Sequence, residues 1–453
     1  MQTCPLQGYF SKIDITQLAE QLRNGKLTSK QITQASLESI RQLDAQVNAF
    51  CYINTVEALK QAEHADQLFA QGVDLGLLQG IPVAIKDNIE TKHMPTTMGS
   101  ALFKDYIPQQ DADCVKHLKQ TGAIIVGKTN THEFAYGPTG DCSYHGVTHN
   151  PWDLTKISGG SSCGSAVAVA TGMVPIAIGT DTGGSIRIPA SLTGVIGFKP
   201  SYERLAKTGV YPLSQTLDHL GILGKTAVDI KIVFESLIKH EKKAQNISYI
   251  QAKTKVAWIA IEQMTDHFDS SQYEEIKIKA FHLLGNKIEN LALDLHHSFT
   301  EIGGCFSAIQ NAEAFRIHQQ NIENNPQLFQ TEVRERLLTS KHTTGWEYLN
   351  AMSLRTQYQQ KMAKLFKMYD FLIMPTLPIS ATNIGQRYIY LNGKQINIKN
   401  ALLSLTCPWN VLGFPACSIP IKGSKNMPFG LQVIAMNQED DKLIQFINQY
   451  CKP

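Results

Sequence analysis

The chain has 453 residues, of which 43% are hydrophobic and 18% charged, and its formal net charge is +3. This length and composition are typical of a compact globular protein with a sizeable core and exclude a disordered chain. The small charge and the lack of basic runs argue against a nucleic-acid partner, and no apolar stretch reaches the roughly 20 residues that a membrane span needs.

The N-terminal part predicts helices, followed by a change to strands. Residues 15–43 predict two helices, and Thr28 with Gln31 forms a capping box at the start of the second. A third helix is predicted over Val56–Ala70. The segment IPVAIKDN then begins with an apolar run that predicts a short buried strand.

Helices and strands alternate from this point on. DADCVKHLKQTG predicts a short helix that ends at Gly122, and AIIVG predicts the next strand. A helix over Ser165–Thr171 is followed by the strand VPIAIG, and GVIGF at about 194–198 predicts another strand. The alternation predicts an α/β protein with a mixed β-sheet core covered on both faces by α-helices.

The segment from about 226 to 345 is more charged and helical, and it carries no obvious chemistry. After it, EYLNAMSLRTQYQQKMAKLF predicts a long helix, and FLIMPT, CSIPI and GLQVIA predict a return to the sheet. Because strands typical of a core lie on both sides of the helical segment, we expect one interrupted domain over residues 1–453 rather than two independent domains.

The nine cysteines are scattered and include no CxxC pair, so neither a zinc site nor a disulfide framework is predicted. The first residues, MQTCPLQGYFSKIDITQ, contain no basic region followed by an apolar run, which is the pattern of a secretion signal. We therefore expect a cytoplasmic protein with buried or incidental thiols and no metal.

Residues 179–185 read GTDTGGS and follow the predicted strand VPIAIG. Glycines let the backbone turn sharply and let another group approach the amide N–H groups, which suits a developing oxyanion. Ser185 at the end of such a turn is a sensible nucleophile. For an isolated GGS, however, a tight turn with a solvated serine is the commoner structure.

Residues 158–165 read SGGSSCGS and allow three interpretations. The plainest is a flexible surface loop. The stretch also matches G-x-S-x-G with Ser162 as the nucleophile, but that motif needs a strand directly before it, and NPWDLTKIS is rich in turn residues. A phosphate loop does not fit, because Ser165 stands where that motif requires lysine.

Lys86 follows directly on the apolar run of IPVAIKDN. Burying an ammonium is costly unless it is paired or neutral. Burial lowers the pKa of a lysine and can leave a free amine that acts as a base. The alternative is a lysine at the end of a strand whose amine reaches water.

The sequence resembles the amidase signature family through three motifs, which occur in the order KDN, GGSS-x-GS and GTDTGGSIRIPA. This family includes bacterial amidases, fatty acid amide hydrolase and the A subunit of the glutamyl-tRNA(Gln) amidotransferase. Lys86 and Ser161 are 75 residues apart, and Ser161 and Ser185 are 24 apart, as in that family. The resemblance is strongest over a signature core at about 80–226. It is weaker at both ends, and about 230–345 is a variable helical segment without support.

The resemblance implies the amidase-signature fold and a Ser-cisSer-Lys triad. Ser185 would be the nucleophile, Ser161 the bridging serine after a cis peptide bond, and Lys86 the base. Asp181 and Arg187 would shape the loop by hydrogen bonds. No metal or cofactor is implied. The oxyanion hole would consist of the backbone N–H groups of Thr182, Gly183, Gly184 and Ser185.

Some residues depart from the family pattern or stand outside it. Cys163 replaces a usual glycine, which strains the loop if the site needs a positive φ and is harmless in a helical conformation. We do not expect Cys163 to be a nucleophile, since no histidine lies nearby in the sequence to activate it. His132, His296 and His297 are expected to be structural or solvated.

Within the family, THEFAYG at 131–137 and Ile188 in GTDTGGSIRIPA favour a free-standing amidase that acts on a small-molecule amide. The alternative is the glutamine-hydrolysing A subunit of a glutamyl-tRNA(Gln)/aspartyl-tRNA(Asn) amidotransferase, and a homodimer is left open. A catalytically dead scaffold is disfavoured because all three triad positions are filled.

By analogy with the family, the acyl pocket would be lined by Ala135, Tyr136 and Gly137, with Tyr136 as an aromatic wall.

Overall fold

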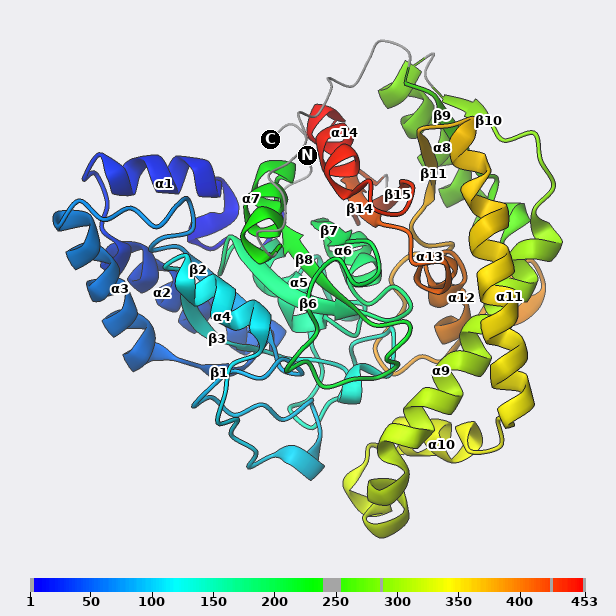
Figure 1. Cartoon of the computed structure of the whole chain (residues 1–453), viewed down its shortest axis with the longest axis horizontal. Coiled ribbons are helices and arrows are strands. Elements are labelled where there is room, and N and C mark those ends of the chain that lie inside the picture. Colours follow the sequence, from blue (N-terminus) through cyan, green and yellow to red (C-terminus); the bar gives the residue numbers. More distant parts are fainter. Residues whose placement is uncertain (1–3, 239–253, 286–287, 424–426, 451–453) are drawn as a thin grey trace.

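The computed structural model describes residues 4–238, 254–285, 288–423 and 427–450. Its centre is an eleven-stranded sheet with the order β1-β3-β2-β6-β8-β7-β14-β15-β11-β9-β10 (Figure 1). The strands of this sheet are β1 Phe50–Ile53, β2 Pro82–Lys86, β3 Ile124–Thr129, β6 Ile176–Asp181, β7 Ile196–Lys199, β8 His219–Gly224, β9 Val256–Trp258, β10 Ile288–Asn290, β11 Phe371–Pro375, β14 Ala416–Ile421 and β15 Phe429–Ile434.

The sheet is mixed. β2 is parallel to both of its neighbours, β3 and β6, whereas β8, β7, β14, β15 and β11 follow one another in antiparallel pairs. Two separate two-stranded ribbons are formed by β4 (His149–Asn150) with β5 (Asp153–Ile157), and by β12 (Tyr388–Leu391) with β13 (Lys394–Asn397).

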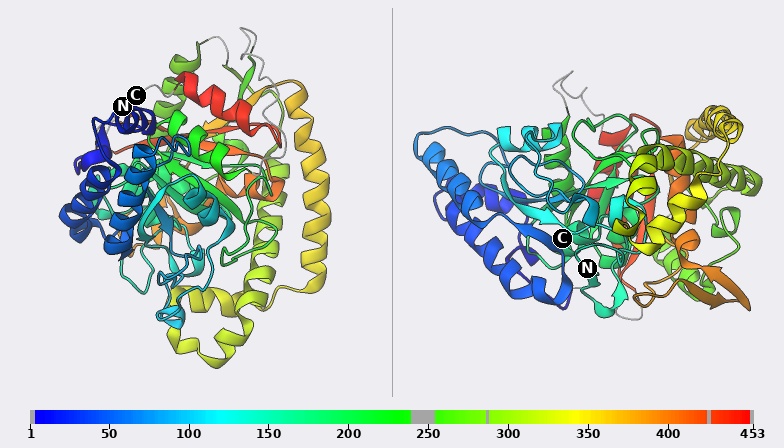
Figure 2. Two further views of the ribbon diagram at one scale, coloured as in Figure 1. Left: turned by 60° about the vertical axis from the view of Figure 1, so that its left-hand side comes forward. Right: turned by 90° about the horizontal axis from the view of Figure 1, so that it is seen from below.

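Helices lie on both faces of the sheet, as predicted, and Figures 1 and 2 show α1 to α3 on one side of the molecule and α9 and α11 on the opposite side. The helices are α1 Ile15–Arg23, α2 Ser29–Val47, α3 Thr55–Ala70, α4 Asp113–Gln120, α5 Cys163–Ala170, α6 Arg187–Thr193, α7 Ala227–Leu237, α8 Ser270–Leu284, α9 His296–Asn324, α10 Thr331–Ser340, α11 Gly345–Ala363, α12 Ile398–Ser404, α13 Cys407–Leu412 and α14 Asp440–Tyr450.

The apolar runs of the central strands form two cores, one on each face of the sheet. In β2, Val83 and Ile85 belong to the larger core, whereas Ala84 belongs to the second core on the other face. β6 repeats this alternation, with Ile178 in the first core and Ala177 in the second. Because successive side chains of a strand point to opposite faces, a strand buried on both faces needs an unbroken apolar run.

The predicted N-terminal elements are confirmed. The capping box of Thr28 and Gln31 starts α2, and α1 begins with a second capping box, formed by Asp14 and Gln17. After the helical segment, β11, β14 and β15 rejoin the same sheet, while the single interrupted domain stays a prediction. None of the helices in the described ranges is both long enough and apolar enough to cross a bilayer.

The helical segment differs from the prediction in one respect. It contributes two strands to the sheet, β9 and β10, and β9 pairs in parallel with both β10 and β11. Each of these strands has three residues. Such a strand is too short to show the period-two pattern from which a strand is recognised in a sequence.

Candidate active site

The topology brings the three predicted triad residues to one edge of the sheet. Lys86 is the last residue of β2, and Ser185 lies in the turn between β6 and α6. Since β2 and β6 are parallel neighbours, their carboxyl ends meet at the same edge. Ser161 reaches this edge from the loop before α5. The next residue of that loop, Ser162, donates its backbone N–H to the Ser185 carbonyl at 3.2 Å.

The Lys86 side chain is fully buried and surrounded by hydroxyl groups. Its Nζ lies 2.8 Å from Ser161 Oγ and 2.8 Å from Thr180 Oγ1. Burial lowers the pKa of Lys86 from 10.5 to about 7, and the negative charges of Asp181 and Asp218 offset only part of this effect. A large fraction of the amine is therefore neutral near pH 7, as a general base requires.

Ser161 follows a cis peptide bond from Gly160, as the family resemblance implied. Its carbonyl accepts hydrogen bonds from Thr131 Oγ1 at 3.1 Å and from His132 N–H at 3.2 Å. Ser185 is 6% exposed, and its hydroxyl makes no hydrogen bond to any residue that the structure describes. The contact between Lys86 and Ser161 is therefore present, while the transfer from Ser185 to Ser161 stays a prediction.

Asp181 and Arg187 hold together the turn between β6 and α6, as expected. We call residues 181–186 the nucleophile turn, after the role predicted for Ser185. Arg187 Nη2 and Nε donate to the two Asp181 oxygens at 2.9 and 3.1 Å. Burial alone would raise the pKa of Asp181, but the charge of Arg187 keeps that pKa below its ordinary value. The carboxylate also accepts hydrogen bonds from the N–H groups of Gly184 at 2.8 Å and Ile186 at 3.1 Å.

The contact with Gly184 concerns one of the four donors of the predicted oxyanion hole, which as a whole stays a prediction. The Gly184 N–H points at the Asp181 carboxylate, so in this structure it is not available to a developing oxyanion. The N–H groups of Thr182, Gly183 and Ser185 donate to no acceptor within the described residues. These three remain candidates for the hole.

Both glycines of the turn are required by close packing. A Cβ at Gly184, where φ is +134°, would lie 2.2 Å from Thr406 Oγ1. A Cβ at Gly183 would lie 2.6 Å from Phe306 Cζ. Any side chain at either position would therefore displace the wall of the site.

The unusual Cys163 is harmless to the backbone. It is the first residue of α5, and its φ is not in the positive range, so the strain considered from the sequence does not arise. Burial raises the pKa of its thiol, which keeps it in the weakly nucleophilic protonated form.

Ser162 has a different role from the one that G-x-S-x-G would give it. The preceding segment, expected to be rich in turns, contains the strand β5, but β5 pairs with β4 outside the main sheet. The Ser162 hydroxyl donates a hydrogen bond of 3.0 Å to the Thr180 carbonyl. Ser162 therefore connects the loop to β6.

The loop predicted to line the acyl pocket packs against α9 and α10. Tyr136 is 1% exposed, and its hydroxyl lies 3.0 Å from Ser340 Oγ. The guanidinium of Arg336 lies 3.7 Å from the centre of the Tyr136 ring. Gly137 packs on the His132 ring, where a Cβ would lie 2.2 Å from Nε2. The loop is therefore buried against α9 and α10, and its place in the acyl pocket stays a prediction.

The sequence did not reveal a cavity of about 560 Å³ between α9, α10 and α12. Its lining includes Phe306, Arg336, Lys399 and Leu403. A Cβ at Gly183 would lie 2.6 Å from Phe306 and 3.2 Å from Leu403, so these two side chains of the lining pack against the nucleophile turn, although no residue of the turn lines the cavity. Its lining comes from helices more than 100 residues beyond the turn, and no local pattern marks those residues.

The predicted structural histidines divide into buried and exposed ones. His132 is fully buried, and both of its ring nitrogens lack a hydrogen-bond partner among the described residues. Burial lowers its pKa, which favours the neutral ring. His296 Nδ1 lies 3.0 Å from the Glu262 carbonyl, and His297 is exposed beside Glu301.

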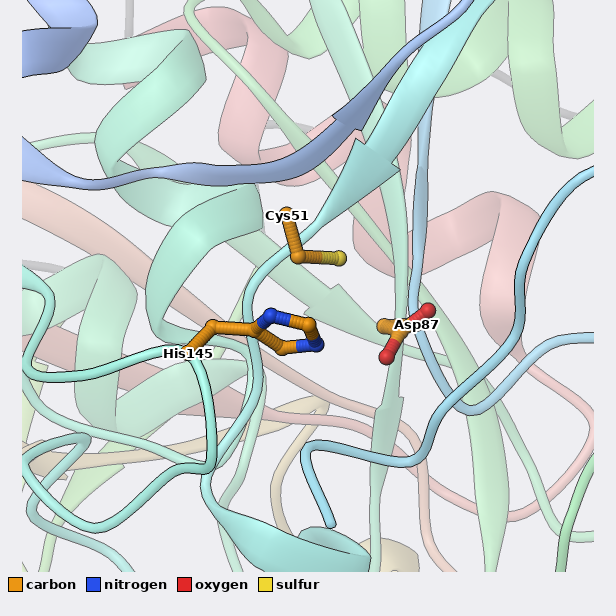
Figure 3. A group of neighbouring side chains, drawn as sticks. All are labelled: Cys51, Asp87 and His145. Carbon is orange, nitrogen blue, oxygen red and sulfur yellow. The ribbon is translucent and has the colours of Figure 1, made fainter. Parts of the chain in front are cut away.

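Cys51, Asp87 and His145 form a cluster beside this edge of the sheet (Figure 3), and their ligand atoms lie within 4.8 Å of one another. The Asp87 carboxylate already accepts a hydrogen bond of 2.5 Å from Thr97 Oγ1. Its other oxygen lies 3.6 Å from Nζ of the buried Lys128. A metal ion would have to compete with this amine, so we assign no metal to the cluster.

Known proteins match nearly the whole chain. A family model described as Amidase matches residues 31–444. The A subunit of the glutamyl-tRNA(Gln) amidotransferase from Clostridium botulinum (strain Alaska E43 / Type E3) is 31% identical, with 97% of each chain covered. A solved structure of an amidase is 30% identical, with a TM-score of 0.88 over 96% of this chain and 98% of that chain.

The solved A subunit of the glutamyl-tRNA(Gln) amidotransferase from Thermotoga maritima is 32% identical, with a TM-score of 0.78 over 97% of this chain and 94% of that chain. The fold, the family match and these relatives agree with the motifs of the sequence. The chain belongs to the amidase signature family, and it is a hydrolase that acts on amide C–N bonds.

Proposed function

We propose that the chain is a free-standing amidase that cleaves a small carboxamide through an acyl-enzyme on Ser185. The observation that carries this proposal is the fully buried Lys86, whose Nζ lies 2.8 Å from Ser161 Oγ and whose pKa burial lowers to about 7. A serine hydroxyl is a weak nucleophile and needs a base, and the neutral amine supplies one through the bridging hydroxyl.

In the first step, Ser185 Oγ attacks the amide carbon while its proton passes to Ser161 Oγ, and the Ser161 proton passes to Lys86 Nζ. The tetrahedral intermediate collapses when the C–N bond breaks and the same relay returns a proton to the leaving nitrogen. Ammonia or an amine then departs. In the second step, water attacks the acyl carbon and gives its proton to the relay, which releases the carboxylate and restores Ser185.

The negative oxygen of the tetrahedral intermediate would be stabilised by the N–H groups of Thr182, Gly183 and Ser185. Loss of one donor from such a hole costs about 10²–10³ in turnover. Asp181 and Arg187 act as positioning residues, because their hydrogen bonds fix the turn that carries these donors.

The alternative, an amidotransferase A subunit, is supported by the curated relatives that carry that name. The free-standing amidase is favoured by the shape of the chain, since at similar identity its TM-score is 0.88 with a solved amidase and 0.78 with a solved A subunit. The buried Ile188, where the amidotransferase has glutamine, also favours the amidase.

We further propose a cytoplasmic location, in keeping with eight free cysteines among the described residues.

A fluorophosphonate probe followed by peptide mass spectrometry tests the proposal. We expect the label on Ser185, release of ammonia from a panel of small amides, and loss of both in Ser185→Ala. Ser236→Ala, on the remote helix α7, is the matched control and should keep both. If only glutamine is hydrolysed, and only when a partner protein is added, the amidotransferase is the correct assignment. An intact protein without label or turnover would contradict both functions.

A further inference from the structure

The side chain of Thr182, in the nucleophile turn, is held by a buried carboxylate. Thr182 Oγ1 donates a hydrogen bond of 2.6 Å to Asp218 Oδ1, and the two residues are only 2% and 6% exposed. The backbone N–H of Thr182 donates to no acceptor among the described residues. A short hydrogen bond to a charged acceptor restricts the rotation of the hydroxyl, so Asp218 fixes the residue whose N–H is a candidate donor of the oxyanion hole.

The Asp218 carboxylate is in turn held by the backbone of a loop that precedes β8. Its second oxygen, Oδ2, accepts hydrogen bonds from the N–H groups of Leu213 at 2.9 Å and Ser214 at 3.0 Å. Burial raises the pKa of Asp218, and the hydrogen bonds from Thr182 and from these two N–H groups oppose this effect. Because both of its oxygens are occupied, the carboxylate lies where the loop places it.

This loop, residues 213–216, is fastened to α9 by the half-buried Glu313. Ser214 Oγ donates to Glu313 Oε2 at 2.5 Å. Thr216 donates its hydroxyl to Oε1 at 2.8 Å and its N–H to Oε2 at 3.2 Å. The Tyr348 hydroxyl of α11 donates to Oε1 at 3.1 Å. The helical segment, in which the sequence showed no obvious chemistry, therefore reaches the nucleophile turn through two hydrogen-bonded carboxylates.

We propose that Asp218 and Glu313 are positioning residues of the oxyanion hole. Glu313 fixes the loop 213–216, the loop fixes the Asp218 carboxylate, and this carboxylate fixes Thr182. Both residues act through Thr182 and not on the reacting atoms. Their contribution belongs to the transition state, because the carbonyl oxygen needs the Thr182 N–H most when it becomes negative. This inference rests on the proposed function, because it assigns the residues that orient one donor of the same site.

The first variant, Thr182→Val, removes the hydroxyl but keeps the backbone N–H and the branched shape of the side chain. For the small amide that the panel shows to be cleaved best, we expect kcat to fall by about 10- to 100-fold and KM to stay within about twofold, because a misplaced donor stabilises the oxyanion poorly. Thr182→Ser, which keeps the hydroxyl, should recover most of the lost turnover. Substitution of Asp218 itself would be ambiguous, because its charge also raises the pKa of Lys86.

The second variant, Glu313→Gln, replaces one acceptor oxygen with an amide NH₂ group and so breaks the hydrogen bonds on one side of the carboxylate. We expect kcat to fall by about 3- to 10-fold in the wild-type background. In the Thr182→Val background the same substitution should have no further effect, because the connection to the hole is already broken. Glu323→Gln, at an exposed glutamate on the same helix, is the matched control and should leave kcat unchanged in both backgrounds.

The inference is overturned if Thr182→Val keeps the wild-type kcat, if Thr182→Ser loses as much as Thr182→Val, or if Glu313→Gln lowers kcat by the same factor in both backgrounds. Should Thr182→Val fail to fold, as judged by its melting temperature, Ser214→Ala takes its place in the comparison with Glu313→Gln. In each of these cases a wild type that is labelled on Ser185 and releases ammonia leaves the proposed function intact. A wild type without label or turnover would refute that function itself.

Discussion

The carboxyl ends of β2 and β3 lie side by side, and each carries a fully buried lysine. Lys128 on β3 has a carboxylate, Asp87, at 3.6 Å and the Thr96 hydroxyl at 2.6 Å. Among the residues that the structure describes, Lys86 on β2 has only the hydroxyl oxygens of Ser161 and Thr180 within hydrogen-bond distance. Burial lowers the pKa of both amines. Asp87 opposes this effect at Lys128 from ion-pair distance, whereas Asp181 and Asp218 offset only part of it at Lys86, with which no carboxylate of the described residues forms an ion pair. The same residue type is therefore paired with a carboxylate in one strand and surrounded by hydroxyl groups in the next, where we propose that it acts as a base.

Replacing Lys86 should have the largest effect on activity. Lys86→Met removes the base of the relay, so we expect kcat to fall by at least about 10³-fold while the protein stays folded. Steady-state ammonia release and circular dichroism measure the two effects. A variant that keeps more than about a tenth of the activity would show that another group takes the proton.

Replacing Lys128 should instead affect stability. Lys128→Met leaves the buried carboxylate of Asp87 without its counterion. We therefore expect the free energy of unfolding, measured with urea, to fall by about 3–5 kcal/mol. The folded fraction should still carry the probe on Ser185. Adding Asp87→Asn to this variant should recover part of the loss, because it removes the unpaired charge. A wild-type unfolding curve for Lys128→Met would refute the structural assignment.

The pH dependence of activity and of stability tests whether Lys86 is neutral in the folded protein. Since Lys86 must be neutral and its pKa is about 7, kcat/KM should rise about tenfold per pH unit below that value and become level above it.

The stability of the fold should also depend on the titration of the Lys86 amine. Between about pH 7 and 10.5 the unfolded chain binds a proton that the folded chain does not, so the free energy of unfolding rises with pH in this window.

Lys86→Met, which has no amine at this position, should lack this contribution. Any advantage in melting temperature over the wild type should therefore shrink as the pH rises from about 7 to about 10. A level activity profile from about pH 5 to 9, or parallel stability curves for the two proteins, would argue against a depressed pKa of Lys86.

The smallest effect is expected at Cys163. Cys163→Gly places the residue usual in the family at the first position of α5, where the backbone does not need it. The activity should stay within about twofold of the wild type. The free energy of unfolding should fall by about 1 kcal/mol, because glycine is a poor helix residue. A large gain in activity would mean that the cysteine distorts the loop.

The sequence predicted the elements whose signal is local. The apolar runs of β2 and β6 and the capping box of α2 depend on neighbouring residues, and the ordered motifs were sufficient to name Lys86, Ser161 and Ser185 as the triad. The structure contains the hydrogen bond between Lys86 and Ser161. The triad itself stays a prediction until the probe and the substitutions are tested.

What the sequence could not predict depends on distant partners. The orientation of the Gly184 N–H is set by the Asp181 carboxylate, which Arg187 in turn holds, and no motif encodes that direction. Thr180 as a second partner of Lys86 follows from the register of β2 against β6. The cavity with Lys399 exists only because α12 returns to α9, far along the chain.

Arg187 also anchors the nucleophile turn to the last third of the chain. Its Nη1 donates to the Thr406 carbonyl at 2.9 Å and to Gln432 Oε1 at 2.6 Å, while Nη2 reaches Asn410 at 2.6 Å. During synthesis, these partners leave the ribosome more than 200 residues after the serine that they help to hold. A nascent or truncated polypeptide is therefore expected to be inert toward cellular amides, and reactivity should begin only when the final strands have joined the sheet.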